Sequence, residues 1–455
     1  MESFTLQGAT SCAYPPAHPS SSLPPDAGPR IKTWHVLRYL VERGNQVTLA
    51  SFLRPEEKEH IPVLREMCEQ VLTVPIRRSR STDAGHWLRS HLSGRPFLVE
   101  RDDILAMRRL AGGVVSSGEV EVIHADQLTM AQFALPSDRS KINYPNTSGL
   151  NRPGQSAGSN GRPRSPRPFL VFDAHNATWT LLDRMHRNVS WPLKPVLALE
   201  MQRVKRYEGS IIRRFDHTLA VSEIDRQALL QAANSLENTN PVNADCVSVI
   251  PIAVDTAQLQ PIRRRPDTNN ILTLGTLHYP PNADGIRWFI RQVFPLIRQA
   301  VTGATLTIIG KNPPSDFARV ASKSPEAITV TGYVPDLTPF LERATVVVIP
   351  VLAGGGMRVR ILEALSRAQP VVTTSIGLEG IEAKPGEDVL VADTPDGFAA
   401  AVVQVLNDRH LQERLSSNGR RLAVTRYDWQ VVLKQLDTVY QTAGQERRAK
   451  TLQEI

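Results

Sequence analysis

The chain has 455 residues, two to three times the length of an average domain, so we expect two domains with separate cores. Its composition, 41% hydrophobic and 22% charged residues, is that of a globular protein and excludes fibrous, collagen-like and wholly disordered chains. Three widely spaced cysteines give neither a disulfide framework nor the paired spacing of a zinc site, so we expect a reducing, cytoplasmic environment.

The net charge of +8 is concentrated in one stretch of the chain. Residues 137–168 contain six basic residues and one acidic residue, and so supply five of the eight charges. The remainder is a weak basis for nucleic-acid binding, and we expect no nucleic-acid partner. The stretch is rich in Gly, Pro and Ser, which predicts a disordered surface loop. The alternative is a basic arm that binds an anionic membrane surface or a nucleic acid.

Membrane and export signals are not evident in the sequence. No apolar run approaches the roughly 18–20 residues that cross a bilayer. The first thirty residues have neither a basic nor an apolar signal-peptide region. We therefore expect a protein that is soluble or peripheral on the inner face of the membrane.

The first half of the chain alternates between helical and strand-like patterns. Apolar residues recur at helical spacing over residues 33–43, and a strand is expected directly afterwards over 47–52. Further short apolar runs predict strands with helices between them, at 120–123, 169–172, 218–221 and 247–251. This alternation is typical of a mostly parallel sheet with helices on both faces.

The second half repeats this rhythm and predicts a second sheet of the same class. We place the N-terminal domain at 1–255, a linker at 256–270 and the C-terminal domain at 271–430. Residues 431–455 are expected to form a C-terminal helix, with a return to the first domain as one option for its path. The strands expected in the second domain are 271–274, 305–309, 329–331, 346–349, 371–374 and 389–391. Two such domains leave a cleft between the carboxyl ends of their sheets, where ligands bind.

A glycine-rich stretch follows the expected strand that ends at Ile349. Three glycines mark the turn that leaves this strand, and a helix is expected over 357–368. Backbone N–H groups at a helix N-terminus bind anions, and two arginines in the first turn would share a diphosphate with them. Glu363 lies further along, where it could accept hydrogen bonds from a ribose. A plain glycine-rich turn with two solvated arginines is the alternative. The expected anion site consists of Gly354, Gly355, Gly356, Met357, Arg358 and Arg360.

Several stretches together resemble a known family. They are PPDAGPRIKTWHVLRYL (24–40), VFDAHNATW (171–179), FDHTLAVSEID (215–225), VSVIPIAVDT (247–256), LTLGTLHYPPNADGIRWF (272–289) and the run from Thr329 to Glu382. In this order they resemble the large retaining family 4, or group 1, of GT-B glycosyltransferases. The variant with YPPN and GGG resembles sugar transferases of exopolysaccharide and cell-envelope glycan assembly. The resemblance implies an α/β fold with two Rossmann-like, doubly wound parallel-sheet domains that face a cleft.

The resemblance also implies an activity, the transfer of a sugar with retention of configuration. The donor would be a nucleotide-sugar, and the acceptor a glycan or a lipid-linked glycan. No cofactor is expected apart from the nucleotide-sugar substrate, and no metal, because no DxD-like pair stands in a matching position. Two alternatives remain open: a nucleotide-sugar epimerase of related architecture, and an inactive glycosyltransferase-like scaffold.

Site roles follow from the resemblance, residue by residue. In the first domain, Gly28 and Arg30 match a loop that meets the donor phosphates and the acceptor, and His175 matches a histidine near the transferred sugar. Without the resemblance, we would favour a core or strand-end role for His175. The further matches are the turn Ser222 and Glu223, the loop residues Gly275, Asn282 and Asp284, the base or phosphate contacts Gly310 and Lys311, and the diphosphate and ribose contacts Arg358, Arg360 and Glu363.

The chain departs from the family pattern in three places. The first of two paired glutamates falls on Gly355, and HYPPNAD replaces a basic pair after the first strand of the second domain. Arg358 and Arg360 would therefore bear most of the phosphate charge. The strand expected before Gly28 is absent, since residues 1–24 offer only a short apolar run at 4–6 and a Pro/Ser-rich stretch. Either residues near 4–14 form an irregular substitute, or the start is not the native one.

Overall fold

The computed structural model describes residues 3–8, 28–135, 167–189, 191–236, 239–265 and 268–453. The chain forms two compact units, one made of Met1–Ile250 and Leu433–Ile455, the other of Pro251–Val432. Nearly all of the stretch 137–168, for which a disordered loop was predicted, lies outside the described residues, as does most of the proline-rich start.

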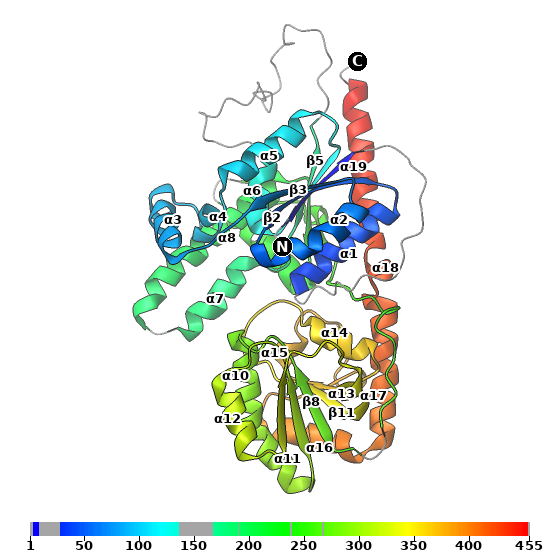
Figure 1. The fold of residues 1–455 in the computed structure, drawn as a ribbon. Coiled ribbons are helices and arrows are strands. Elements are labelled where there is room, and N and C mark those ends of the chain that lie inside the picture. The colour runs from blue at the N-terminus through cyan, green and yellow to red at the C-terminus, as the bar shows by residue number, and fades with distance from the viewer. Residues whose placement is uncertain are drawn as a thin grey trace. The chain divides into compact units, whose positions relative to one another are not determined.

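The first unit is built on a seven-stranded sheet with the order β3-β2-β1-β4-β5-β6-β7 (Figure 1). Its two central strands β4 and β5 are buried along their whole length, because helices cover both faces of the sheet. The strands are β1 (Ser3–Gly8), β2 (Gln46–Leu53), β3 (Gln70–Pro75), β4 (Val122–Asp126), β5 (Phe169–Asp173), β6 (His217–Ala220) and β7 (Val247–Val249).

The strand β1 fills the position that the sequence left in doubt. It pairs with β2 on one side and with β4 on the other, and both pairings are antiparallel, whereas the other pairs in this sheet are parallel. The expected, mostly parallel sheet is confirmed, and β1 is its one antiparallel strand among the described residues. The centre of the sheet has no unpaired edge, because β1 hydrogen-bonds on both sides.

The helices of the first unit include one from the far end of the chain. Helix α19 (Lys434–Gln453) belongs to this unit, and Tyr39 of α1 donates a hydrogen bond of 2.9 Å to Asp437 of α19. The other helices are α1 (Gly28–Glu42), α2 (Ile61–Met67), α3 (Arg80–Ser93), α4 (Phe97–Arg101), α5 (Leu105–Ser116), α6 (Leu128–Ala134), α7 (Thr178–Asn188), α8 (Lys194–Arg214) and α9 (Glu223–Asn234), with short 3-10 turns η1 (Pro55–His60), η2 (Trp191–Leu193) and η3 (Ala244–Cys246).

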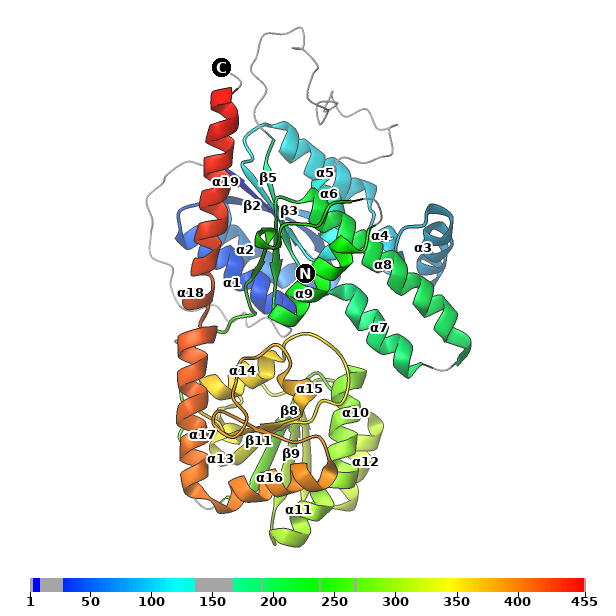
Figure 2. The ribbon, with the colours of Figure 1, turned by 180° about the vertical axis from the view of Figure 1, so that it is seen from behind.

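The second unit has a six-stranded sheet in which all pairings are parallel, with the order β10-β9-β8-β11-β12-β13. Its strands are β8 (Asn270–Leu274), β9 (Thr305–Ile309), β10 (Ile328–Gly332), β11 (Ala344–Ile349), β12 (Val371–Thr373) and β13 (Leu390–Val391). Figure 2 shows helices on both sides of this sheet. They are α10 (Pro280–Trp288), α11 (Phe294–Ala300), α12 (Ser315–Lys323), α13 (Thr338–Arg343), α14 (Val359–Ser366), α15 (Ser375–Leu378), α16 (Pro395–Asn407), α17 (Arg409–Leu422) and α18 (Trp429–Val432), with the π-helical turns η4 (Phe289–Val293) and η5 (Ala423–Tyr427).

The boundary between the units differs from the expected one. The segment 256–270, predicted as a linker, belongs to the second unit. Arg420 of α17 donates hydrogen bonds to the backbone carbonyls of Thr256 and Leu259, at 3.0 and 2.9 Å. The backbone N–H of Arg265 donates to the carbonyl of Glu342 at 2.7 Å. These hydrogen bonds hold the segment against the second unit, although its sequence lacks a helical or strand period.

Among the described residues, no helix is both long enough and apolar enough to cross a membrane.

Candidate functional site

The strand order of the second sheet marks where a ligand should bind. The chain winds outward from β8 through β9 to β10, then returns to the other side of β8 and continues from β11 to β13. The direction reverses between β8 and β11, and in open parallel sheets ligands bind beyond the carboxyl ends of the strands at such a point. The loops that follow β8 and β11 hold Gly275 and the three glycines 354–356.

Glycines let these loops approach one another closely. A Cβ on Gly310, which follows β9, would lie 2.0 Å from the carbonyl oxygen of Gly275, and a Cβ on Gly285 of α10 would lie 1.6 Å from that of Pro350. Neither position can hold a side chain without a shift of the backbone. Gly354, with φ of 103°, lies against Pro281. The structure thus brings Gly275 and Gly310 together at the carboxyl ends of β8 and β9, while Gly354 lies near the start of α10 and beside Arg358.

Arg358 closes the glycine-rich loop on itself. Its Nη1 donates to the carbonyl oxygens of Gly355 and Gly356, at 2.5 and 3.0 Å. Helix α14 begins at Val359 and not at Met357 as predicted, because Arg358 has non-helical dihedral angles, φ of −90° and ψ of 87°. Arg358 is therefore the N-cap residue, and of the two arginines only Arg360 lies in the first turn.

The remaining charged residues of this edge make local pairs. Arg360 Nη1 lies 2.7 Å from Glu363 Oε2, so the expected phosphate and ribose contacts form an ion pair on one helix face. Asp284 is exposed and pairs with Arg287 at 2.7 Å, and Asn282 Nδ2 donates to the carbonyl of Thr276 at 3.3 Å. Lys311 Nζ lies 4.7 Å from the centre of the Tyr333 ring.

The first unit has a buried polar cluster at the carboxyl ends of β4 and β5. Asp126 ends β4, Asp173 ends β5, and His175 follows two residues later; all three are buried. His175 Nε2 lies 2.5 Å from Asp126 Oδ1, and Thr33 of α1 donates to Asp126 Oδ2 at 2.8 Å. Although His175 Nε2 and Asp126 Oδ1 are close, neither ring nitrogen of His175 has a hydrogen-bond partner among the described residues, and both nitrogens are buried. The cluster therefore places the imidazole beside a carboxylate, with hydrogen-bonding capacity on the ring that no described residue uses.

A fully buried ion pair lies beside this histidine. Lys32 Nζ, on a side chain that is 1% exposed, donates to Asp173 Oδ1 at 2.5 Å. Burial alone would raise the pKa of Asp173, but the Lys32 ammonium and the His124 hydrogen bond hold this pKa below its ordinary value. Asp173 is therefore a carboxylate at neutral pH, and Lys32 neutralises it.

Helix α19 contributes the last member of the cluster. His124 Nε2 lies 3.3 Å from Asp173 Oδ2, and its Nδ1 lies 2.8 Å from the hydroxyl of Tyr440. Burial raises the pKa of Tyr440 above its usual range, so the hydroxyl keeps its proton. A carboxylate only accepts hydrogen bonds, so Nε2 of a neutral His124 donates to Asp173 and Nδ1 accepts from Tyr440.

The same cluster contains three residues that could hold a metal ion. Ligand atoms of Asp126, Asp173 and His175 all lie within 4.8 Å of one another. Lys32 and Thr33 already bind the two carboxylates, however, and the Lys32 ammonium supplies the positive charge that a cation would bring. The donor set therefore fits a cation only if Lys32 moves away, and we derive no step through a metal.

The other predicted residues of the first unit lie at helix ends. Gly28 begins α1, and Arg30 pairs with Glu57 at 2.9 Å. Ser222 is the N-cap of α9, where its hydroxyl donates to Asp225 at 2.5 Å. Asp225 in turn accepts a hydrogen bond from the backbone of Ala177, so the N-terminus of α9 is tied to the loop that carries His175. Glu223 is exposed and pairs with Arg226 at 3.1 Å.

Sequence reasoning missed Lys32, His124, Asp126 and Tyr440. The strand predicted at 120–123 was too short, so Asp126 was not recognised as a strand-end residue. It could have been found because the strand runs on to the sequence IHAD, which resembles the FDAH of the next strand in placing an aspartate at the carboxyl end. No local signal marks Tyr440, which lies 316 residues from its partner His124.

Comparisons of sequence match the second unit to a family model. Residues 268–408 match the family model described as glycosyl transferases group 1. The chain is 27% identical over 232 residues to phosphatidyl-myo-inositol mannosyltransferase of Mycobacterium leprae, a match that covers 50% of this chain and 59% of the relative. It is 29% identical over 213 residues to glycogen synthase of Mycobacterium tuberculosis, covering 44% and 50%. The chain thus spans about half the length of the curated relatives it matches.

A comparison of folds covers both units. The structure of Alr3699/HepE from Anabaena, in complex with UDP and glucose, aligns with 93% of this chain and 98% of its own, with a TM-score of 0.59. At 13% identity this likeness concerns the fold. Two α/β units, each built on a mostly parallel sheet, are the GT-B architecture. The chain therefore has the GT-B fold, and its second unit matches the glycosyl transferases group 1 family.

Proposed function

We propose that the chain is a glycosyltransferase that moves a sugar from a nucleotide-sugar donor to a glycan or a lipid-linked acceptor, with retention of configuration. The observation that carries the proposal is the carboxyl edge of the second sheet, where Gly275 and Gly310 lie against each other, Gly354 lies beside Arg358, and Arg360 stands in the first turn of α14. Glycines allow close approach of a ligand to the backbone, and the two arginines supply positive charge at the switch point.

The proposed chemistry is the departure of a nucleoside diphosphate. As the bond between sugar and diphosphate breaks, negative charge grows on the leaving phosphate, and fixed cations stabilise it. Arg360 is the better candidate for direct contact, since it lies in the first turn of α14 and its pair with Glu363 runs along the same helix. Arg358 donates hydrogen bonds to the carbonyls of the glycine loop, and we propose that it maintains the conformation of this loop.

Relatives supply the choice of donor and acceptor class. The HepE structure contains UDP and glucose, and another structure of the same protein contains UDP-glucose. The sequence relatives are named for mannosyl transfer to a phosphatidylinositol and for glycogen synthesis. Uridine diphosphate and its sugars are therefore the first donors to test. We assign His175 of the first unit to the transferred sugar, because it follows the carboxyl end of β5 and matches the histidine that the resemblance places near that sugar.

A panel of radiolabelled nucleotide-sugars tests the activity. We expect the label to move to a glycan or lipid-linked acceptor. Epimer formation without transfer would support a nucleotide-sugar epimerase, and neither product, with every donor, would support an inactive scaffold.

Affinity measurements test the site. Arg360→Ala should weaken binding of UDP by about 1.5–3 kcal/mol, or roughly 10- to 150-fold, the range of charge-assisted hydrogen bonds. Arg358→Ala should weaken it similarly, because the glycine loop loses its internal hydrogen bonds. The matched control is Arg298→Ala in α11, whose side chain pairs with the exposed Glu326. Parent-like affinity in both variants would place the diphosphate elsewhere.

A further inference from the structure

The hairpin formed by α7, η2 and α8 exposes apolar side chains at its tip. Trp191 is 83% exposed and Leu193 is 60% exposed, values far above those of a packed residue. Three more apolar residues of the hairpin are exposed, namely Met185, Val196 and Leu199. Single exposed apolar residues are common on protein surfaces, but five within fifteen residues of sequence form a group that calls for a partner.

Trp179 and Leu182 of α7 pack against the core of the unit, whereas none of the described hydrophobic residues from 185 to 199 belongs to that core. None of the described residues from 178 to 203 is buried, whereas α8 becomes buried from Val204 onward. Figures 1 and 2 both show α7 and the first half of α8 projecting away from the sheet. The exposed residues therefore lie on a protrusion that the fold does not need for its core.

The tip is basic. Residues 184–199, which we call the hairpin tip, contain three basic residues and no acidic residue. Arg187 is 72% exposed and pairs with Asp183 just before the tip, which leaves a net positive charge. Tryptophan beside apolar and basic residues is typical of segments that lie in the headgroup region of a membrane.

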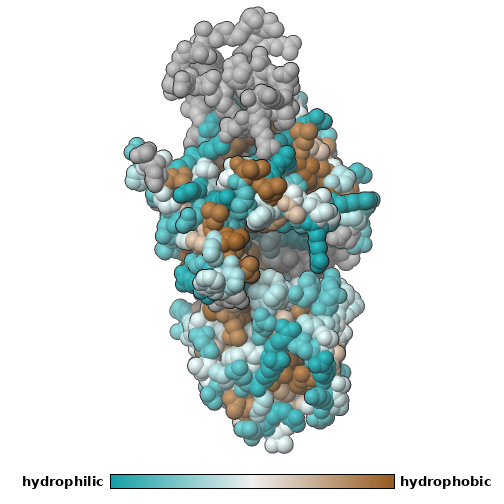
Figure 3. All heavy atoms as spheres, turned by 90° about the vertical axis from the view of Figure 1, so that its left-hand side faces the viewer, coloured by the Kyte–Doolittle hydropathy of each residue, from teal (hydrophilic) through white to brown (hydrophobic). Residues whose placement is uncertain are grey.

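A second group of apolar residues lies on the neighbouring helix α3. Leu92 is 82% exposed, and Leu88 and Trp87 are also exposed. Helix α4, which follows α3, is bound to α8 through a hydrogen bond of 2.6 Å from the backbone of Phe97 to Glu200. Figure 3 shows the side of the molecule on which these helices lie, with apolar side chains among hydrophilic ones.

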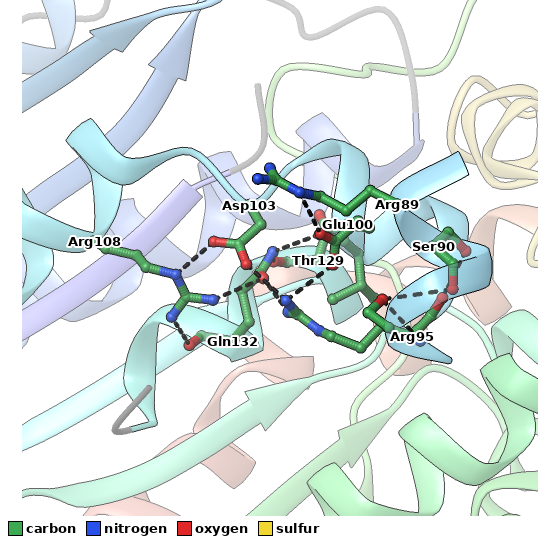
Figure 4. Close-up of polar contacts among 10 residues, drawn as sticks. Arg89, Ser90, Arg95, Glu100, Asp103, Arg108, Thr129 and Gln132 are labelled. Atoms are coloured by element: carbon green, nitrogen blue, oxygen red, sulfur yellow. Dashed lines mark hydrogen bonds and ion pairs between the residues drawn. The ribbon is translucent and has the colours of Figure 1, made fainter. Parts of the chain in front are cut away.

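A charged network fixes α3 and α4 in place (Figure 4). Arg95 donates to Asp103 at 2.6 Å and to Gln132 of α6 at 2.7 Å, and Arg108 of α5 also binds Asp103. Ser90 of α3 donates to the carbonyl of Arg95 at 2.7 Å. Although burial opposes it, the two arginines keep the pKa of Asp103 below its usual value, so the network stays charged. The exposed residues of α3 thus lie on a helix whose C-terminal end is held by this network.

From these features we infer that the hairpin tip, with the exposed face of α3, docks onto an anionic phospholipid surface. Trp191 and Leu193 would enter the interface, and Lys194 and Arg187 would bind phosphate headgroups. A second copy of the chain fits less well, because a two-fold contact through the tip would bring like charges together. The inference goes beyond glycosyl transfer and concerns a different part of the chain from the donor site.

Sedimentation with vesicles tests this surface. The probes are vesicles of phosphatidylcholine alone and of phosphatidylcholine with about 30% phosphatidylglycerol, a composition chosen so that the membrane carries negative charge. The parent chain should bind the anionic vesicles at least tenfold more tightly than the neutral ones. Trp191→Ser/Leu193→Ser should reduce binding at least tenfold, and Arg187→Glu/Lys194→Glu should remove the preference for anionic vesicles.

A matched control tests whether exposed apolar residues elsewhere on the protein also bind vesicles. Val424 and Val431 are exposed residues of the second unit, and Val424→Ser/Val431→Ser should leave vesicle binding unchanged. The variants alter exposed side chains, apart from Lys194, which is partly exposed, so melting temperatures should match that of the parent. Parent-like binding by the tip variants, or no binding by the parent, overturns the proposal. So does a parent dimer in sedimentation velocity that the tip variants convert to monomer, since a second copy would then cover the surface. UDP binding is measured on the same samples, so a failed donor site is recognised separately.

Discussion

His175 and Asp126 show how the fold prepares one side chain for a ligand. The imidazole is 6% exposed, and its Nε2 lies 2.5 Å from the Asp126 carboxylate. The carboxylate lies beside Nε2, but neither ring nitrogen has a hydrogen-bond partner among the described residues, so the ring keeps its capacity to hydrogen-bond a ligand. A strand-end histidine with a purely structural role would not need a ring nitrogen with unused hydrogen-bonding capacity.

We expect His175→Ala to lower kcat tenfold or more while UDP affinity stays nearly unchanged, because the diphosphate is assigned to the second unit. Asp126→Asn should lower kcat by a smaller factor, since the ring remains and loses only the charge of the neighbouring carboxylate. Turnover, UDP affinity and melting temperature are measured on one preparation of each variant. Unchanged turnover per folded molecule in His175→Ala would remove this residue from the site.

A second prediction at the scale of residues concerns how much the Lys32–Asp173 pair contributes to stability. Lys32→Met leaves a buried carboxylate without its counter-charge, and should lower the free energy of unfolding by about 3–5 kcal/mol. The pKa of Asp173 lies below its unfolded value in the parent, so the pair stabilises the fold above about pH 4, and this stability is lost as the pH falls.

Denaturant unfolding of both proteins between pH 3 and 7 measures the effect. The loss in Lys32→Met should be largest near neutral pH and smaller in acid, where the lone carboxyl becomes protonated. The control uses a surface pair instead of a buried one: Arg38→Met, which removes the contact with Glu42, should change stability by less than about 1 kcal/mol. A pH-independent difference between Lys32→Met and parent would contradict the assigned ion pair.

At the scale of elements, one buried carboxyl joins the two helices of the hairpin α7–α8. Glu208 of α8 accepts hydrogen bonds from the backbone N–H groups of Thr178 and Trp179, at 2.7 and 3.1 Å, and so caps the N-terminus of α7. Trp179 also donates through Nε1 to the carbonyl of Ala228 in α9. The base of the projecting hairpin is therefore anchored, even though its tip is not packed.

Glu208 predicts a pH dependence. Burial raises its pKa to about 7, although the two backbone hydrogen bonds oppose the shift. The folded state then holds this proton more strongly than the unfolded state, so stability should fall as the pH rises from about 4.5 to 7, by about 3 kcal/mol at most. Glu208→Gln cannot ionise and should remove this slope.

The measurement is the free energy of unfolding of Glu208→Gln and parent across pH 4.5–8. The exposed variant Glu413→Gln serves as the control and should keep the parent's slope. If Glu208→Gln also keeps the parent's slope, another group causes it.

At the scale of the molecule, the first unit is assembled from two distant parts of the chain. Helix α19 follows the whole second unit in sequence and yet belongs to the first. Its contacts there include the Tyr440 hydrogen bond to His124 and the Asp437 bond to Tyr39, and the side chain of Leu436 is buried. The first unit therefore cannot complete its core until the second has been synthesised.

Leu436→Ala should destabilise the first unit by about 2–5 kcal/mol, the usual cost of a cavity in a core, and leave the second unaffected. Hydrogen exchange measures both at once: amides of α1 and β4 should exchange faster, while those of β8 and β11 should not. The exposed neighbour Gln435→Ala is the control. Faster exchange in β8 and β11 would show that the units do not unfold separately.

Much of the second unit could be predicted from the sequence alone. Its strands are short continuous apolar runs, because a parallel strand covered on both faces must be apolar on both. The predicted strands at 271–274, 305–309 and 346–349 correspond to β8, β9 and β11, each within two residues. The glycines of the loops were also recognisable, since close approach of two backbones excludes any other residue. These features depend on neighbours in sequence.

Other features were decided only by tertiary structure. Strand β3 was missed because it is an edge strand and only partly buried, so it lacks the continuous apolar run of a central strand. The antiparallel direction of β1 depends on its two partners, and α14 begins late because Arg358 bonds to the loop before it. The cluster around Asp173 joins side chains from α1, β4, β5 and α19, and the last of these is hundreds of residues from the others. No local sequence pattern predicts this cluster, because its polar residues become buried and come into contact only when the elements pack together.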